Sequence, residues 1–137
     1  MEAQNSVKEK AQGFRPDCLV KVPTTLDDFF KTWLIFLKPY HELTDRQIDI
    51  AACFLKHRYE LSTVIKDERL LDENVMSEST KRKIREECDV TNAHFQVIMG
   101  ELRKHKIIVN GAINPRYIPA LKENAKNFSF MLYFQLQ

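Results

Sequence analysis

Few side chains in this chain of 137 residues stand in a pattern that supports catalysis. Its four histidines lie outside any HExxH or CxxC context: His41, His57, His94 and His105. The sequence contains no glycine-rich phosphate loop and no serine in a nucleophile elbow. Asp45 and Asp49 share one face of a predicted helix, but a solvated face near a helix N-terminus explains them better than a metal pair. The sequence therefore predicts a binding protein rather than an enzyme, with no catalytic residue, metal site, cofactor or small-molecule substrate.

The three cysteines are Cys18, Cys53 and Cys88, an odd number with no CxxC pair. Disulfide frameworks and zinc sites normally use an even number of cysteines, often at short spacings. The cysteines are therefore expected to be buried free thiols in a reducing cytosol.

Basic side chains gather in two stretches that could hold the phosphates of a nucleic acid. The first stretch, in a predicted helix, comprises Lys81, Arg82, Lys83 and Arg85. The second stretch comprises Arg103, Lys104 and Lys106, with Arg116 on a predicted hairpin wing. A solvated face, balanced by neighbouring glutamates, is an equally good interpretation of both. Because 21 Lys and Arg face 19 Asp and Glu, the net charge is only +2, so nucleic-acid binding would need such a local patch.

The composition is that of a globular, helix-rich protein, with 44% apolar residues, three glycines and five prolines. The first helix is predicted from Thr25 to about Leu37. Thr25 can cap this helix, Asp27 and Asp28 lie in its first turn, and Pro39 is expected to end it.

The next predicted helix starts at Thr44, where Thr44 and Gln47 form a capping-box pattern. It has two apolar faces, which indicates a position between two layers. The helix of residues 25–37 is expected to pack on the face of Ile50 and Phe54, and the C-terminal half of the chain on the other. That other face comprises Ile48, Ala51, Ala52, Leu55 and Tyr59.

Residues 77–113 carry the pattern of two helices followed by a β-hairpin. Ser77 or Ser79 can cap a helix that ends near Glu87, and Thr91 can cap a second helix over residues 92–104. The pair Asn110-Gly111 between short apolar runs is a strong hairpin signal. With a short helix expected near residues 64–71, this order predicts a winged helix. The inward stripe of the second helix comprises Phe95, Ile98, Met99 and Leu102.

Both ends of the chain are expected to be extended. Residues 1–16 are polar and read as an arm, and residues 17–23 could form a short strand. Near the C-terminus, large apolar residues alternate with others, which is the period of a strand with one apolar face: Phe128, Phe130, Leu132, Phe134 and Leu136. Such a strand must join the wing, pair with residues 19–22, or add to the sheet of a neighbouring molecule.

Residues 44–121 resemble the small winged-helix proteins of crAss-like tailed phages, which infect Bacteroidetes. The segments that carry the resemblance are Leu43–Ile50, Thr80–Arg85, Val90–Thr91, Leu102–Ile108 and Ile113–Pro119. The last of these, Ile-Asn-Pro-Arg-Tyr-Ile-Pro, is the most distinctive. The resemblance implies a phage protein made in a bacterial cytoplasm, and it leaves open whether the protein regulates DNA or is built into the virion.

The outer face of the second helix gives a mixed test of these two functions. A base-reading helix presents Arg, Asn, Gln or Lys to the major groove. This face instead carries Ala93, Val97 and Gly100, with Lys104 at its end and Gln96 and Glu101 beside it. Because glycine lowers helix stability by about 1 kcal/mol relative to alanine, Gly100 is expected to serve close packing. The face therefore favours contact with protein.

Together these patterns predict a mainly α protein with a small β component, a winged helix-turn-helix with an N-terminal helix layer. The expected organisation is an arm at residues 1–16, a winged-helix domain at 17–121, and a linker and strand at 122–137.

The favoured function is a virion structural component of the connector or tail-ring type, which contacts copies of itself and other virion proteins. It is assembled in the host cytoplasm and has no membrane partner, since the longest apolar runs are far too short to span a bilayer. The expected interface residues are Ala93, Val97, Gly100, Phe128, Phe130, Leu132, Phe134 and Leu136. The alternative is a DNA-binding regulator that uses Lys81, Arg82, Lys83, Arg85, Gln96, Arg103, Lys104, Lys106 and Arg116.

Overall fold

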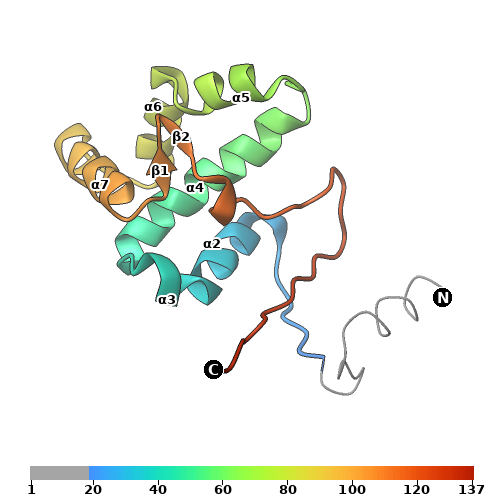
Figure 1. Cartoon of the computed structure of the whole chain (residues 1–137). Helices are drawn as coiled ribbons and strands as arrows, with labels where there is room; N and C mark the ends of the chain where they lie inside the picture. Colours follow the sequence, from blue (N-terminus) through green and yellow to red (C-terminus); the bar gives the residue numbers. More distant parts are fainter. Residues whose placement is uncertain (1–18) are drawn as a thin grey trace.

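The computed structural model describes residues 19–137, which are mainly helical with one two-stranded antiparallel sheet (Figure 1). The prediction of a mainly α protein with a small β component is confirmed. The expected arm at residues 1–16, and Cys18, lie outside the described residues. None of the helices in the described part is long and apolar enough to cross a membrane. In chain order the helices are α2 (Leu26–Phe36), α3 (Lys38–His41), α4 (Asp45–Ser62), α5 (Glu68–Val75), α6 (Glu78–Glu87) and α7 (Asn92–Lys104).

Side-chain caps set the helix starts that the sequence predicts. The hydroxyls of Thr25, Ser77 and Thr91 each accept a hydrogen bond from a backbone N–H in the first turn of α2, α6 and α7. At α4, Thr44 and Gln47 complete the capping box. These predictions are confirmed because a cap depends only on residues three positions apart.

Two boundaries differ from the prediction. Helix α2 ends at Phe36, and Pro39 lies in the first turn of the short helix α3 rather than stopping the helical path. A proline is tolerated there because the first N–H groups of a helix have no partner within it. Helix α5 begins at Glu68, not near residue 64, because Asp67 accepts a hydrogen bond from Leu70 N–H and caps it.

Helix α4 lies in the middle of the molecule, with α2 and α3 on one side and α6 and α7 on the other (Figure 1). Two ion pairs join α2 to α4: Lys31–Asp49 (2.9 Å) and Asp27–Lys56 (2.7 Å). The earlier residue of α2 pairs with the later residue of α4, so the two helices are antiparallel. The ring of Phe30 lies 5.9 Å from that of Tyr59, centroid to centroid.

The fully buried Phe54 lies on the opposite side of α4 from this contact. Its ring is 6.3 Å from that of Phe95 in α7. The two-layer prediction holds, but α2 does not pack on the Phe54 face as expected. Helix α2 packs on the Tyr59 side and α7 on the Phe54 side. Part of the C-terminal half does meet the predicted face, because Tyr59 donates to the carbonyl of Lys122 and Leu55 lies beside Pro119. Both faces are apolar, so helical periodicity alone does not say which neighbour each one receives.

Helices α6 and α7, the turn between them and the β1–β2 hairpin form at the predicted residues. Asp89 adopts a positive φ of 49° in the turn between α6 and α7, and the whole predicted inward stripe of α7 is buried. Strands β1 (Ile108–Val109) and β2 (Ala112–Ile113) pair with Ile108 opposite Ile113. Asn110 and Gly111 both have positive φ, 54° and 74°, as a type I′ turn requires. A single 3₁₀ turn, η2 (Pro115–Tyr117), follows the hairpin.

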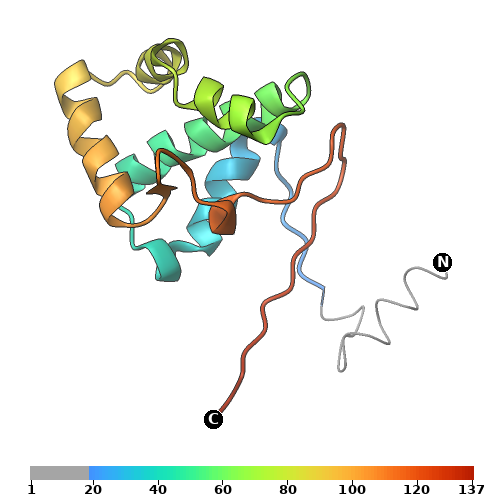
Figure 2. The same ribbon diagram turned by 45° about the horizontal axis from the view of Figure 1, so that its top comes forward.

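The two predicted terminal strands do not form. Within the described residues, residues 19–23 are extended but belong to no sheet, and no strand lies in residues 122–137. Figure 2 shows the C-terminal segment leaving the helical body as extended chain. A strand needs a partner for its backbone groups, and the hairpin strands are only two residues long. The alternating pattern produced an extended segment, but no strand edge in residues 19–137 pairs with it.

Candidate protein interface

The outer face of α7 is open and mostly small or apolar, with Gln96 beside its centre. Ala93, Gln96, Val97 and Gly100 are all exposed, and Val97 retains 64% of its accessible surface. An ideal Cβ added at Gly100 would find no atom within 4 Å outside its own helix turn. The glycine therefore serves no packing purpose among the described residues. It leaves the α7 backbone accessible to a closely approaching surface.

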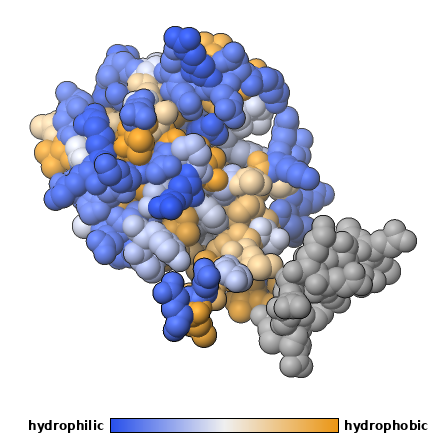
Figure 3. Space-filling view, in the orientation of Figure 1, coloured by the Kyte–Doolittle hydropathy of each residue, from blue (hydrophilic) through white to orange (hydrophobic). Residues whose placement is uncertain are grey.

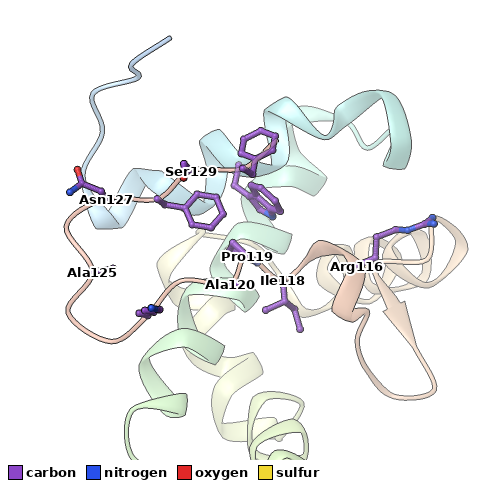
Figure 4. Close-up of a pocket in the computed structure, with 11 residues that line it drawn as sticks. Arg116, Ile118, Pro119, Ala120, Ala125, Asn127 and Ser129 are labelled. Atoms are coloured by element: carbon purple, nitrogen blue, oxygen red, sulfur yellow. The ribbon is translucent and has the colours of Figure 1, made fainter. Parts of the chain in front are cut away.

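The second basic stretch is solvent-exposed. Arg103, Lys104, Lys106 and Arg116 are all exposed, and Lys106 adopts a positive φ of 64° just before β1. Figure 4 shows the Arg116 side chain extending away from Asn127 and Ser129. The expected basic residues of this stretch are thus accessible, although none of them lies on the central part of the outer face of α7.

The first basic stretch includes a residue with a structural role. Arg85 donates to Glu78 at 2.6 Å, and its guanidinium lies over the ring of Phe95, 5.2 Å from the centroid. The hydrogen bond and the charge of Arg85 hold the pKa of Glu78 below its usual value. Arg85 therefore joins α6 to α7, and its prediction as a phosphate ligand is corrected. Arg82 and Lys83 remain exposed, and Lys81 is half-buried.

An aromatic cluster joins the C-terminal segment to α2 (Figure 4). The Trp33 ring makes edge-on contacts with Phe128 and Phe130, at centroid distances of 5.5 and 5.2 Å. Phe29 lies 5.2 Å from Phe128, and Phe36 lies 6.3 Å from Phe130. The Trp33 indole N–H donates to the carbonyl of Tyr117 at 2.8 Å. Edge-to-face aromatic pairs of this kind each contribute about 0.5–1.5 kcal/mol beyond simple burial.

The cluster divides the predicted apolar stripe into two parts. Phe128 and Phe130 pack on α2 of their own chain, and Phe130 still keeps 43% of its surface exposed. The outer residues Leu132, Phe134 and Leu136 remain 50%, 76% and 92% exposed. Figure 3 shows hydrophobic side chains gathered along this segment. We call Leu132, Phe134 and Leu136 the C-terminal stripe.

A shallow pocket of about 480 Å³ lies between Trp33 and the chain from Arg116 to Phe130 (Figure 4). Its lining includes two cationic side chains, Arg116 and Lys122, and no histidine, cysteine or carboxylate. It therefore lacks the imidazole and carboxylate groups that most often act as general acid or base. In residues 19–137, no three His, Cys, Asp or Glu side chains converge as a metal site would need.

Three contacts around α4 could not be predicted from the sequence. Cys53 and Cys88 are free and half-buried thiols whose sulfurs lie only 3.0 Å apart. His57 Nε2 lies 3.0 Å from a carboxylate oxygen of Glu87. The guanidinium of Arg46 donates to the carbonyls of Cys88 and Asp89 at the turn after α6. These partners are 30 to 43 residues apart in the sequence, so no local pattern reveals them.

Comparison of the chain with models of protein families, with curated proteins and with solved structures found no match.

Proposed function

We propose that this chain is a structural component of a tailed-phage virion, a connector or tail-ring subunit that contacts copies of itself and other virion proteins through a winged-helix domain. The C-terminal stripe is the observation that carries the proposal. Leu132, Phe134 and Leu136 are large apolar side chains at alternate positions, each at least half exposed. Contiguous exposed apolar residues mark interaction surfaces. The resemblance to winged-helix proteins of crAss-like phages supports assembly in a bacterial cytoplasm.

The backbone of the C-terminal segment supports strand addition as the mode of contact. Within the described chain, residues 128–137 make no backbone–backbone hydrogen bond. An extended segment with free N–H and C=O groups can add to the edge of a neighbour's sheet. Full burial of each stripe residue contributes about 1.5–3 kcal/mol, so even partial burial stabilises an assembly.

The outer face of α7 provides a second contact in this proposal. The order α4, α5, α6, turn, α7 and hairpin is consistent with a winged helix, in which α7 would occupy the position of the recognition helix. In this chain that position presents Ala93, Val97 and Gly100, small or apolar residues that suit a protein surface better than base edges. The proposal is therefore a winged helix that binds protein rather than an enzyme or a base reader.

The test compares two triple variants of the full chain. The stripe variant carries serine at Leu132, Phe134 and Leu136. The control variant carries serine at Met131, Tyr133 and Gln135, which lie on the opposite face of an added strand. Sedimentation and native mass spectrometry should show an oligomer for the unchanged chain and the control, and a monomer for the stripe variant. Equal association of all three proteins, or equal loss in both variants, would contradict strand addition through the stripe.

Purified virions provide the second measurement. Quantitative mass spectrometry should detect the chain at a fixed number of copies per particle, in proportion to the other connector or tail proteins. Absence from particles produced in cells that express the protein would refute the virion assignment.

A DNA-binding regulator is the second candidate, supported by the exposed basic residues on α6 and around β1. Arg82, Lys83, Arg103, Lys104 and Lys106 are all free to contact phosphates. If the chain is such a regulator, footprinting at physiological salt should find a defined operator. In the proposed function, duplex binding is weak, independent of sequence and steeply dependent on salt.

A further inference from the structure

Cys53 and Cys88 are two thiols in direct contact that the proposed function does not use. Cys53 lies within α4, and Cys88 is the C-cap residue that directly follows α6. Their Sγ atoms are 3.0 Å apart, and both side chains are half-buried. A disulfide needs a separation of about 2.05 Å, so the sulfurs need to approach by only about 1 Å.

The surroundings make the two thiols chemically unequal. The hydrogen bond from Cys53 and the positive charge of Arg46 lower the pKa of Cys88, against opposing effects of burial and of Glu87 and Asp49. The same hydrogen bond and burial raise the pKa of Cys53. Thiolates are the nucleophiles of thiol–disulfide exchange, so Cys88 attacks first and Cys53 resolves.

We propose that Cys53 and Cys88 are a redox pair that forms a reversible intramolecular disulfide by exchange with a small-molecule disulfide such as oxidised glutathione. The Cys88 thiolate attacks one sulfur of the reagent, whose S–S bond breaks and releases a thiolate. Cys53 then gives up its proton and attacks Sγ of Cys88, which releases the second thiolate. The two protons pass to the released thiolates. Two protein thiols are thus oxidised by two electrons, and one small disulfide is reduced to two thiols.

The disulfide would link α4 covalently to the turn between α6 and α7. The two cysteines are 35 residues apart, and the closed loop contains α5 and α6. Arg46 already holds this turn through the carbonyls of Cys88 and Asp89, so the covalent link adds to an existing contact. Oxidation therefore locks the orientation of α6 against α4. The inference rests on these contacts alone and stands whether or not the chain is a virion protein.

The test uses the full chain with Cys18→Ser, so that only the pair can react. After incubation with oxidised glutathione, intact mass should fall by two hydrogens, and peptide mapping should join residues 53 and 88. Closing a loop of this length should raise the Tm by roughly 10 °C, and dithiothreitol should reverse both changes.

Single-cysteine variants separate the two roles. In the same background, Cys53→Ser should accumulate a glutathione adduct on Cys88, and Cys88→Ser should react at least tenfold more slowly. Three results would each overturn the inference: stable glutathione adducts on both cysteines of the Cys18→Ser protein, a disulfide that forms only in denaturant, or a disulfide that lowers the Tm. Thermal melts of the reduced variants confirm that each protein is folded before it is oxidised.

Discussion

Replacing Gly100 with alanine tests the outer face of α7 with opposite effects on two measurable quantities. Gly100 lies within the helix, and the added methyl group would meet no atom within 4 Å. Alanine is more stable than glycine in a helix interior by about 0.5–1 kcal/mol. The free energy of unfolding should therefore rise by that amount, which corresponds to a Tm increase of about 2–4 °C for a chain of this size.

The same methyl group should weaken association. If a partner approaches the α7 backbone at Gly100, a methyl group there overpacks the contact, which typically costs about 1–3 kcal/mol. That range corresponds to about a 5- to 150-fold loss of affinity. Urea denaturation of the dilute monomer and sedimentation at increasing concentration measure the two effects separately.

Gly111→Ala is the matched control. The same methyl group again meets nothing within 4 Å, but Gly111 has a φ of +74°, where a side chain is strained. This control should lose about 1 kcal/mol of stability and keep its association. A Gly100→Ala protein that gains stability and associates normally would refute the close-approach argument, and one that loses stability would refute the description of an open helix face.

Two further predictions concern the folded chain itself. Phe54→Ala should lower the free energy of unfolding by about 3–5 kcal/mol in urea denaturation, because Phe54 is fully buried against Phe95, and a loss below about 1 kcal/mol would contradict that packing. Leu43 N–H donates to His41 Nδ1 (3.0 Å), so Nε2 carries the proton and donates to the Leu34 carbonyl (2.7 Å), and burial lowers the pKa of this neutral ring. The unfolded chain then binds the proton more readily, so the free energy of unfolding should fall as pH drops below about 6.5 and level off only below the pKa of the folded state. Urea denaturation from pH 7 to 5 should show a smaller loss of stability in His41→Gln than in the unchanged chain. An equal loss in both proteins would refute this role of His41.

Local interactions explain most of the fold that could be predicted. The caps at Thr25, Thr44, Ser77 and Thr91 and the turn at Asn110-Gly111 each depend on residues within four positions of one another. The buried stripe of α7 follows from helical geometry in the same way, because its apolar residues repeat with the period of the helix.

The parts of the candidate site that could not be predicted depend on which segments meet in space. The outer face of α7 follows from periodicity, so Ala93, Val97 and Gly100 were predicted and are exposed. The role of Arg85 could not be predicted, because its partner Phe95 lies on the next helix. The same holds for Phe128, whose alternating pattern marks an apolar face but does not indicate that α2 covers it.

The sequence by itself determined where α2, α4, α6, α7 and the hairpin begin, which faces of the helices are apolar, and that the composition is that of a globular helical protein. Those properties follow from backbone preferences and from contacts between near neighbours in the chain. Only the tertiary structure decided which face of α4 receives α2, that two rings of the apolar stripe pack on α2 while the rest stays exposed, and that Cys53 and Cys88 touch. These outcomes depend on how apolar surfaces are matched across the whole chain, and burial of apolar area is non-directional, so a pattern shows that a face must be covered without naming its partner.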